Sequence, residues 1–216
     1  MVTDPHRLSV QNLSLTFGKH TILRNISHTF TGGNIYGIVG SNGCGKTVLM
    51  KCICGLLPAD TGNITFDNEK TTIPQGTFGV VIETPGFLPD FSGYANLAML
   101  AGLRRKVCKE EILSVLQDVG LRLDAKKKVG KYSLGMRQRL GIAQAVMDDP
   151  PVLLLDEPLN GLDQASVERT YDLLMRMRDK GKIILLASHH KQDIDSLCDE
   201  VLDIDDGLLR EGKAPF

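Results

Sequence analysis

Residues 40–47 of the chain, GSNGCGKT, combine glycines with a lysine and a hydroxyl side chain in a spacing suited to binding phosphate. The glycines let the backbone curve around an anion, with successive N–H groups pointing inward beside a helix N-terminus. Lys46 can then reach the β- and γ-phosphates, and the Thr47 hydroxyl can ligate Mg²⁺. The segment predicts a nucleoside triphosphate site formed by Gly40, Ser41, Asn42, Gly43, Cys44, Gly45, Lys46, Thr47 and Val48.

The sequence on either side of this loop supports the same interpretation. Residues 35–39 form a short apolar run without alternation, which is typical of a strand covered on both faces. Residues 48–54 fit the first turns of a helix. A glycine-rich turn that matches by chance is the alternative, and the strand–loop–helix setting argues against it.

A second group of candidate residues follows the apolar run 152–155. Asp156 is suited to hold Mg²⁺, directly or through water, because Mg²⁺ prefers a few carboxylates together with phosphate oxygens. Glu157 should point elsewhere, where it can orient or deprotonate an attacking water. The alternative is that the two acids only cap a helix or form a surface pair.

A histidine follows the next apolar run, residues 183–187. His189 should therefore emerge at the same edge as the two acids, where an imidazole can hydrogen-bond a γ-phosphate or the catalytic water. A lone histidine is more often structural, but its position at a strand end favours a function. His190 is assigned a structural role.

A helix beginning near residue 134 carries a further candidate. Ser133 and Gly135 can offer a hydroxyl and backbone N–H groups to a phosphate at the start of that helix. Taken alone, Ser133 is equally well explained as an ordinary helix N-cap.

The elements expected to position these residues alternate between strands and helices. Strands are predicted at 8–17 and 26–30, antiparallel across a turn near 18–20, and at 63–67, 78–82, 152–155, 183–187 and 200–204. Helices are predicted at 96–103, 109–119, 134–147, 164–180 and 191–198. The pattern indicates an α/β fold with a largely parallel sheet, whose ligand lies at the carboxyl edge of the strands, and a helical insert over residues 85–149.

Composition limits the function classes. The chain has 216 residues, 42% hydrophobic and 24% charged, with a formal net charge of -1, so nothing predicts a nucleic-acid partner. No apolar run is long enough to cross a bilayer, and residues 1–6 lack the apolar core of a signal peptide. The short basic runs 104–106 and 126–128 fit a solvated face better than contact with anionic lipid headgroups.

The five cysteines show no paired spacing, which indicates a reducing cytosol rather than a disulfide framework. Cys52 and Cys54 should point to different sides of a helix and so make a poor metal pair. We expect both to behave as small buried apolar residues.

Taken in order, these segments resemble the nucleotide-binding subunit of an ABC transporter, over nearly the full length of the chain. Residues 40–47 look like the Walker A motif, 152–157 like Walker B, 132–138 like the signature motif, and 160–163 like the D-loop. The resemblance makes Glu157 the catalytic glutamate, His189 the switch histidine and Asp163 an ATP-contacting residue. It also places Phe17 where an aromatic ring stacks on adenine, with a strand core residue as the alternative.

The sequence departs from the family pattern at two places. In the signature motif, Leu134 and Met136 stand where the family has a glycine and the glutamine, whereas Ser133 and Gly135 remain. The glutamine of the Q-loop is matched by Glu83, a predicted Mg²⁺ ligand. These features are similar to ABC ATPases of the bacitracin- and lantibiotic-resistance type.

The resemblance implies a P-loop NTPase (RecA-like) core, with an N-terminal antiparallel β subdomain and an α-helical insert. The chain would form one ABC ATPase domain over 1–216, with the core in 1–84 and 150–216 and the helical subdomain in 85–149. It implies ATP and Mg²⁺ as cofactors, a second ATPase subunit, and a membrane-spanning permease at the cytoplasmic face of a bacterial-type membrane. The substrate would be a peptide antibiotic or a similar amphiphile that is exported.

Three other function classes are weighed against this one. Soluble ABC-type ATPases that act on ribosomes or DNA usually carry two nucleotide-binding units or long coiled coils, and this chain has neither. A P-loop kinase of small molecules would not need Ser133 and Gly135. A regulatory module with weak activity is disfavoured by Asp156, Glu157 and His189.

Overall fold

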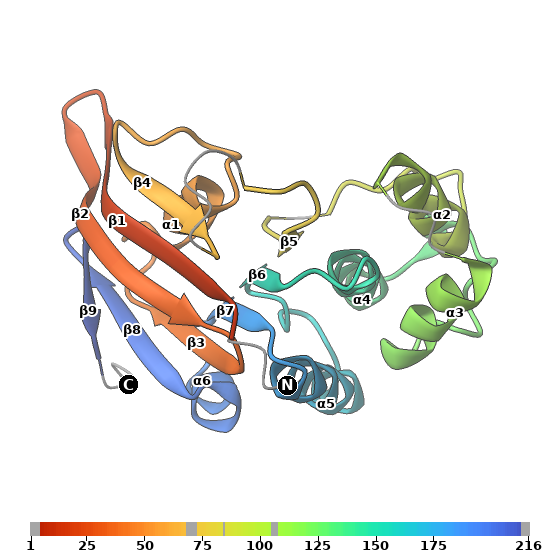
Figure 1. Cartoon of the computed structure of the whole chain (residues 1–216). Coiled ribbons are helices and arrows are strands. Elements are labelled where there is room, and N and C mark those ends of the chain that lie inside the picture. The colour runs from red at the N-terminus through yellow and green to blue at the C-terminus, as the bar shows by residue number, and fades with distance from the viewer. Residues whose placement is uncertain (1–4, 68–72, 84, 105–107, 213–216) are drawn as a thin grey trace.

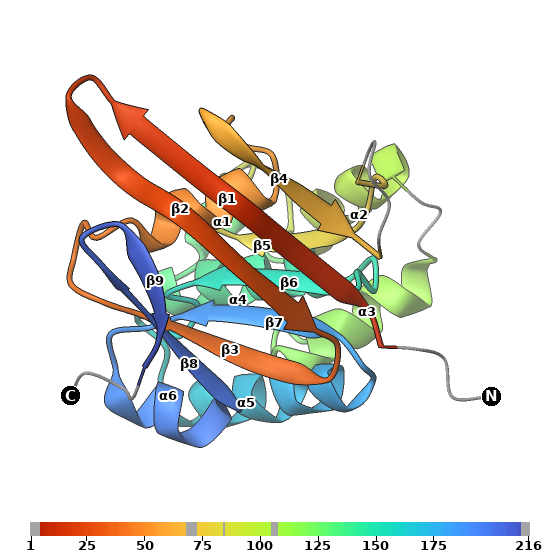
Figure 2. The same cartoon turned by 60° about the vertical axis from the view of Figure 1, so that its left-hand side comes forward.

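Two β-sheets and the helices around them make up the computed structural model, which describes residues 5–67, 73–83, 85–104 and 108–212. An antiparallel sheet has the order β2-β1-β4, and a larger sheet has the order β5-β6-β7-β3-β8-β9. Figure 2 shows the hairpin of β1 and β2 crossing in front of the larger sheet, with α5 and α6 behind it. The expected α/β fold with a separate antiparallel part is confirmed.

The antiparallel sheet consists of β1 (Arg7–Phe17), β2 (His20–Thr31) and β4 (Thr61–Phe66). β1 pairs with both neighbours, and its inward side chains alternate with exposed ones, which is the pattern of a sheet with one buried face. The predicted hairpin and its turn are confirmed. β2 begins at His20, six residues before the predicted start.

The larger sheet contains β3 (Asn34–Val39), β5 (Phe78–Val81), β6 (Val152–Asp156), β7 (Ile183–Ala187), β8 (Glu200–Asp205) and β9 (Leu208–Glu211). Its first five strands pair in parallel, and only β9 is antiparallel. Strand β9 was not among the sequence predictions. It is an exposed edge strand of four residues, too short to show a clear alternation.

Both faces of the parallel strands are buried, which explains their uninterrupted apolar sequence. In β7, Ile183 and Leu185 face a core shared with the antiparallel sheet and with helix α1 (Lys46–Ile53). Ile184 and Leu186 face a second core, which is shared with the helices on the other side. The parallel sheet is therefore clamped between two apolar layers, which hold its carboxyl edge in place.

The described residues between β5 and β6 form helices and no strand: α2 (Gly93–Arg104), α3 (Lys109–Asp118), the short 3₁₀ helix η1 (Val129–Lys131) and α4 (Leu134–Val146). Figure 1 shows α2 and α3 at the opposite end of the molecule from the β1–β2 hairpin, with α4 next to the sheet. The division at residues 85 and 149 into a separate subdomain stays a prediction.

The remaining helices are α5 (Gln164–Asp179) and α6 (Lys191–Leu197), both close to their predicted ranges. Helix α1 begins at Lys46, two residues before the predicted start. Among the described residues, Cys52 is buried as expected and Cys54 only partly. No helix in the described ranges is long and apolar enough to span a membrane.

The basic runs 104–106 and 126–128 were both predicted to lie on a solvated face. Lys126, Lys127 and Lys128 are exposed, in agreement with a solvated face. Residues 105–107 lie outside the described residues, as do residues 1–4.

Candidate functional site

The loop between β3 and α1 forms the floor of a small hollow of about 240 Å³. Gly40 adopts φ +138°, and a Cβ at this position would lie 2.5 Å from the Ile204 carbonyl oxygen. Gly45, at φ +115°, is the N-cap of α1. Only glycine fits such conformations without strain, so these two residues allow the loop to turn tightly into the helix N-terminus. The residues that line the hollow are Asn42, Gly43, Gly45, Lys46, Thr47, Val48, Asp156 and Glu157.

Lys46 lies folded over the loop. Its Nζ donates to the carbonyl oxygens of Gly40 at 2.8 Å and Ser41 at 3.0 Å, and it lies 3.9 Å from Cys44 Sγ. The side chain is only 9% exposed. The backbone carbonyl oxygens satisfy the buried Lys46 ammonium. The ammonium and the N-terminus of α1 lie side by side, and each of them favours a bound anion.

Thr47 and Asp156 meet across the hollow. The Thr47 hydroxyl donates to Asp156 Oδ2 at 2.5 Å, which connects the start of α1 with the end of β6. A hydroxyl and a carboxylate are hard oxygen ligands of the kind Mg²⁺ takes. No group of three or more His, Cys, Asp or Glu residues in the described ranges could hold a metal by itself. The donor set therefore fits an ion that completes its shell with phosphate oxygens and water.

Glu157 turns away from its neighbour Asp156. Its φ is +49°, in the left-handed region that is uncommon for a residue with a side chain. Its backbone N–H donates to the Ala187 carbonyl oxygen at 2.9 Å, and its own carbonyl oxygen accepts from Gln138 Nε2 at 3.1 Å. The pairing of β6 with β7 and the contact with helix α4 thus fix the backbone from which the Glu157 side chain projects.

The carboxylate of Glu157 contacts His189. The distance from His189 Nδ1 to Glu157 Oε1 is 2.9 Å, whereas Oε2 is buried and no donor in the described part of the chain reaches it. The His189 side chain is half exposed, and its ring lies 4.0 Å from that of His190. The structure therefore brings Lys46, Thr47, Asp156, Glu157 and His189 together at one edge of the sheet.

The residues predicted from the signature motif and the D-loop lie elsewhere on the chain. Ser133 is the N-cap of α4 and its Oγ accepts from Met136 N at 3.2 Å, while Asp163 is the N-cap of α5 and accepts from Ser166 N at 2.8 Å. None of them lines the phosphate hollow. A Cβ at Gly135 would lie 2.8 Å from the Gly161 carbonyl oxygen, so the two segments are in contact with each other.

Phe17 and Glu83 also lie outside the hollow. Phe17 is half exposed at the end of β1, as an aromatic ring available for stacking should be, and is not a core residue. Glu83 follows β5 with φ +61°, and its Oε1 is 2.5 Å from Lys51 Nζ. Glu83 and Lys51 line a different hollow of about 360 Å³, and neither lines the phosphate hollow.

Sequence reasoning missed two residues that contact predicted site residues, one at the phosphate hollow and one outside it. Gln138 lies on α4 and holds the Glu157 backbone, and Lys51 lies on α1 and pairs with Glu83. Gln138 falls within the recognised signature segment, but only the packing of α4 shows that its side chain reaches Glu157.

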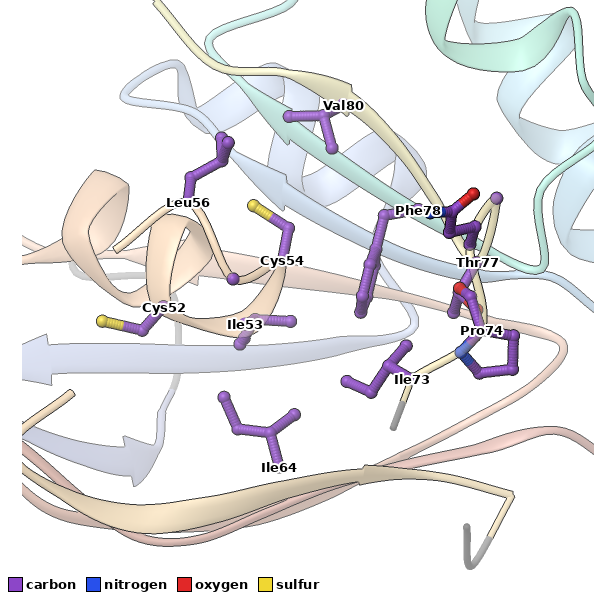
Figure 3. Close-up of a pocket in the computed structure, with 13 residues that line it drawn as sticks. Cys52, Ile53, Cys54, Leu56, Ile64, Ile73, Pro74, Thr77, Phe78 and Val80 are labelled. Atoms are coloured by element: carbon purple, nitrogen blue, oxygen red, sulfur yellow. The ribbon is translucent and has the colours of Figure 1, made fainter. Parts of the chain in front are cut away.

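A larger hollow, of about 770 Å³, lies near the C-terminal end of α1 and contains none of the predicted site residues. Figure 3 shows its mostly apolar lining, with Ile53 and Cys54 on one side, Phe78 and Val80 of β5 on another, and Ile64 below. Cys52 also lines this hollow, and burial raises the pKa of its thiol to about 11, which disfavours the thiolate. The hollow does not belong to the phosphate site.

With this geometry established, the fold and the phosphate loop define a P-loop nucleotide-binding protein. The family described as "ABC transporter" matches residues 23–160. The chain is 41% identical over 210 residues to an uncharacterised ABC transporter ATP-binding protein, YybJ of Bacillus subtilis, covering 95% of this chain and 96% of the relative. The chain therefore belongs to the ABC transporter family, as an ATP-binding subunit and an ATPase.

Other relatives carry names that include a substrate. The bacitracin transport ATP-binding protein BcrA of Enterococcus faecalis is 38% identical, with 98% of this chain and 69% of the relative covered. The lantibiotic transport ATP-binding protein SrtF of Streptococcus pyogenes is 34% identical, with 95% and 88% covered. The resemblance to ABC ATPases of this type is thus confirmed.

Solved structures share the fold. A dimeric ATP-binding cassette in a post-hydrolysis state, bound to ADP and phosphate, superimposes with a TM-score of 0.85 at 22% identity, over 97% of this chain and 99% of the other. An ATP-binding subunit of an ABC transporter gives a TM-score of 0.86 at 23% identity, covering 96% and 90%. The ABC cassette fold expected from the motifs is confirmed.

Proposed function

We propose that this chain binds Mg²⁺-ATP at the loop of residues 40–48, dimerises around two nucleotides, and drives a membrane permease that exports a peptide antibiotic or a similar amphiphile. The observation that carries the proposal is the juxtaposition of the Thr47–Asp156 pair with the Glu157–His189 pair at one sheet edge. One pair offers hard oxygen ligands, and the other offers a base and its orienting imidazole.

The chain's own groups would bind the triphosphate first. Backbone N–H groups of the loop would donate to the phosphates, and the Lys46 ammonium would exchange the carbonyl oxygens of Gly40 and Ser41 for phosphate oxygens. Thr47 and Asp156 would hold Mg²⁺, which supplies charge neutralisation when bound. Phe17, exposed at the end of β1, would stack on the adenine.

Glu157 and His189 would then act on the attacking water. Glu157 Oε2 is buried and has no donor among the described residues, so its lone pairs would accept from the attacking water once nucleotide binding places that water against it. Oε1 holds His189 through Nδ1, which leaves Nε2 of the imidazole to contact the γ-phosphate. Most of the catalytic effect comes from positioning and charge neutralisation, as in other phosphoryl transfers.

A second subunit would complete the site. Ser133, Gly135 and Asp163 lie at the N-termini of α4 and α5, outside the phosphate hollow of their own chain, and the contact of Gly135 with Gly161 brings their two segments together. In a head-to-tail dimer each such surface would cover the partner's nucleotide. A γ-phosphate contacted from both sides favours the closed state, and its hydrolysis removes that preference.

The permease would bind at the cytoplasmic face of the membrane, through the Glu83 segment and the helical part of the chain. Export of a peptide antibiotic is supported by the names of the bacitracin and lantibiotic relatives. Co-purification of a polytopic membrane protein from detergent extracts would test this arm of the proposal.

The catalytic role is tested with Glu157→Gln. We expect ATP binding to persist and turnover to fall on the order of a hundredfold, because the amide cannot accept the proton. Binding of a fluorescent ATP analogue and release of phosphate measure the two steps. Glu168→Gln, an exposed acid on α5, is the matched control. Hydrolysis by Glu157→Gln at the rate of the unaltered protein would reject the proposed base.

A further inference from the structure

A buried polar group lies directly behind the candidate switch histidine. Ser188 precedes His189 at the end of β7 and is 3% exposed, and Asp193 in α6 is 6% exposed. Ser188 Oγ donates to Asp193 Oδ2 at 2.7 Å, and the Tyr171 hydroxyl on α5 donates to Asp193 Oδ1 at 2.7 Å. Each carboxylate oxygen of Asp193 therefore has its own short hydrogen bond.

The loop that carries His189 is fastened on both sides by this group. The backbone N–H of His190 donates to Ser188 Oγ at 3.1 Å, and the N–H groups of Asp193 and Ile194 donate to the His190 carbonyl oxygen at 3.1 Å and 3.4 Å. The residues on either side of His189 thus share one hydrogen-bonded unit centred on Asp193, while the His189 side chain itself projects outward and is half exposed.

A buried carboxylate destabilises the fold unless its oxygens accept hydrogen bonds. The Asp193 carboxylate must therefore stay where Ser188 and Tyr171 can donate to it. Burial, together with the hydrogen bond to Asp193, raises the pKa of the Tyr171 hydroxyl, so this group stays a neutral donor. Removal of either donor would leave a buried charged oxygen without a partner, which makes the unit intolerant of displacement.

Tyr171 connects this unit to another predicted contact of the ATP site. It lies on α5, whose N-cap is Asp163 of the D-loop segment. Eight residues of helix separate the two, a rise of about 12 Å. The helix is a rigid connection between a surface proposed to face the partner subunit and the loop that carries His189.

We propose that Asp193 is a positioning residue for hydrolysis: through Ser188 it sets where His189 stands relative to Glu157, and through Tyr171 it ties that position to α5. The inference rests on the proposed function of His189. Asp193 touches neither nucleotide nor water in this scheme and acts only through the loop.

The test uses the full chain with Tyr171→Phe and Asp193→Asn, each alone and combined with His189→Ala. We expect each single variant to lower kcat about three- to tenfold with KM nearly unchanged, because a positioning loss affects the transition state. In the His189→Ala background the same changes should have no further effect on kcat. Equal losses in both backgrounds, or unchanged kcat in the single variants, would overturn the inference.

Two controls separate positioning from general loss of stability. Asp199→Asn alters a carboxylate that accepts from Ile35 N, and Thr170→Val removes a buried hydroxyl that donates within α5. Both should lower stability in chemical denaturation without changing kcat. Tyr171→Phe deletes a single hydroxyl, so it keeps the test valid where Asp193→Asn fails to fold.

An NMR measurement, which needs no ATP hydrolysis, reports on the environment of the His189 ring directly. In protein labelled with ¹⁵N-histidine, Tyr171→Phe should shift the His189 ring resonances and leave those of exposed His20 unchanged. An unshifted His189 signal would contradict the proposal.

Failure of the proposed function can be distinguished from failure of the positioning inference. If His189→Ala alone hydrolyses ATP normally, the role of His189 is wrong; if it is impaired while Tyr171→Phe and Asp193→Asn are not, only the positioning inference is wrong.

Discussion

At the scale of single residues, the site separates two adjacent carboxylates into two environments. Asp156 ends β6 and accepts from Thr47, while Glu157 takes a left-handed backbone conformation and faces His189. Such a conformation costs on the order of 1–3 kcal/mol, and it persists where the surrounding contacts enforce it. Here the Ala187 carbonyl oxygen and the Gln138 side chain do so. Neighbours in sequence can therefore serve different chemical steps.

Glu83 is predicted to affect the metal dependence of ATP binding. In the structure it is paired with Lys51, so Mg²⁺ would compete with an ammonium group for its carboxylate. Glu83→Gln should change the Mg²⁺ concentration needed for half-maximal binding of a fluorescent ATP analogue, measured in a Glu157→Gln background. Lys51→Met should shift it in the direction of tighter Mg²⁺ binding. Superimposable Mg²⁺ titrations for all variants would contradict a metal role for Glu83.

Cys44 is predicted to be a site at which alkylation blocks ATP binding. It lies within the phosphate loop, and its sulfur is 3.9 Å from Lys46 Nζ. A maleimide adduct would fill the space that the phosphates need, so modification should abolish binding, and ATP added first should slow it. Mass spectrometry of the Cys44 peptide measures the protection, with exposed Cys108 as the internal control. Equal labelling of Cys44 with and without ATP would refute this.

At the scale of elements, helix starts and strand ends position the site. Ser133 and Asp163 cap α4 and α5, and the hydrogen bonds of Asp163 to Ser166 lower the pKa of its carboxyl group. The N-cap interpretation of Ser133 is thus correct, and it leaves the side chain at a helix N-terminus where an anion is favoured. Both the N-cap hydrogen bond and the proposed phosphate contact place the Ser133 hydroxyl at the N-terminus of α4, so one role does not exclude the other.

The β2–β8 region is predicted to make stability depend on pH. Burial between Phe30 and Tyr36 lowers the pKa of His28, and Glu200 and Glu211 only partly offset this. The unfolded chain, with a histidine pKa near 6.5, then binds the proton more readily than the folded chain. Stability should therefore decrease as pH falls below about 6.5, until the lower pKa of the folded state is passed.

Urea denaturation at pH 7.5 and 5.5 checks this pH dependence. His28→Phe should reduce the difference in the free energy of unfolding between the two pH values, because it removes the proton-binding group and keeps an aromatic ring. The exposed His20→Gln variant is the control. An unchanged pH dependence in His28→Phe would show that other groups cause it.

At the scale of the whole molecule, the two cores on opposite faces of the parallel sheet hold β3, β6 and β7 in register. The end of each of these strands leads into a part of the candidate site: the phosphate loop, the Asp156–Glu157 pair and His189. The surface with Ser133 and Asp163 lies outside the phosphate hollow of the same chain. In the proposed head-to-tail dimer, these two surfaces of one chain would face two different nucleotides.

ATP is predicted to drive dimerisation. Glu157→Gln, which should trap ATP, is expected to shift from the 23.6 kDa monomer to about twice that mass in sedimentation experiments with Mg²⁺-ATP. Ser133→Arg in the same background should prevent the shift, because the added side chain would occupy the partner's phosphate position. A monomer that persists at saturating ATP, with binding verified, would contradict the proposed dimer.

Much of this molecule could be predicted from its sequence, because the determining signals are local. The spacing of glycines before Lys46 and Thr47, the acids after an apolar run, and the histidine after the next run each indicate phosphate chemistry without reference to distant residues. The order of these motifs indicated the family, and apolar runs without polar alternation indicated strands buried on both faces. Strand β9 lacked such a signal and was missed.

Tertiary structure alone decided which partners these residues have. That Glu157 faces His189 and not Thr47, that Glu83 pairs with Lys51, and that Tyr171 and Ser188 share Asp193 all depend on which strands and helices are neighbours. The physical reason is the sequence distance over which each feature is determined. Backbone conformation and the pattern of buried and exposed side chains depend on a few consecutive residues, whereas a side-chain contact between distant segments depends on the packing of the entire chain.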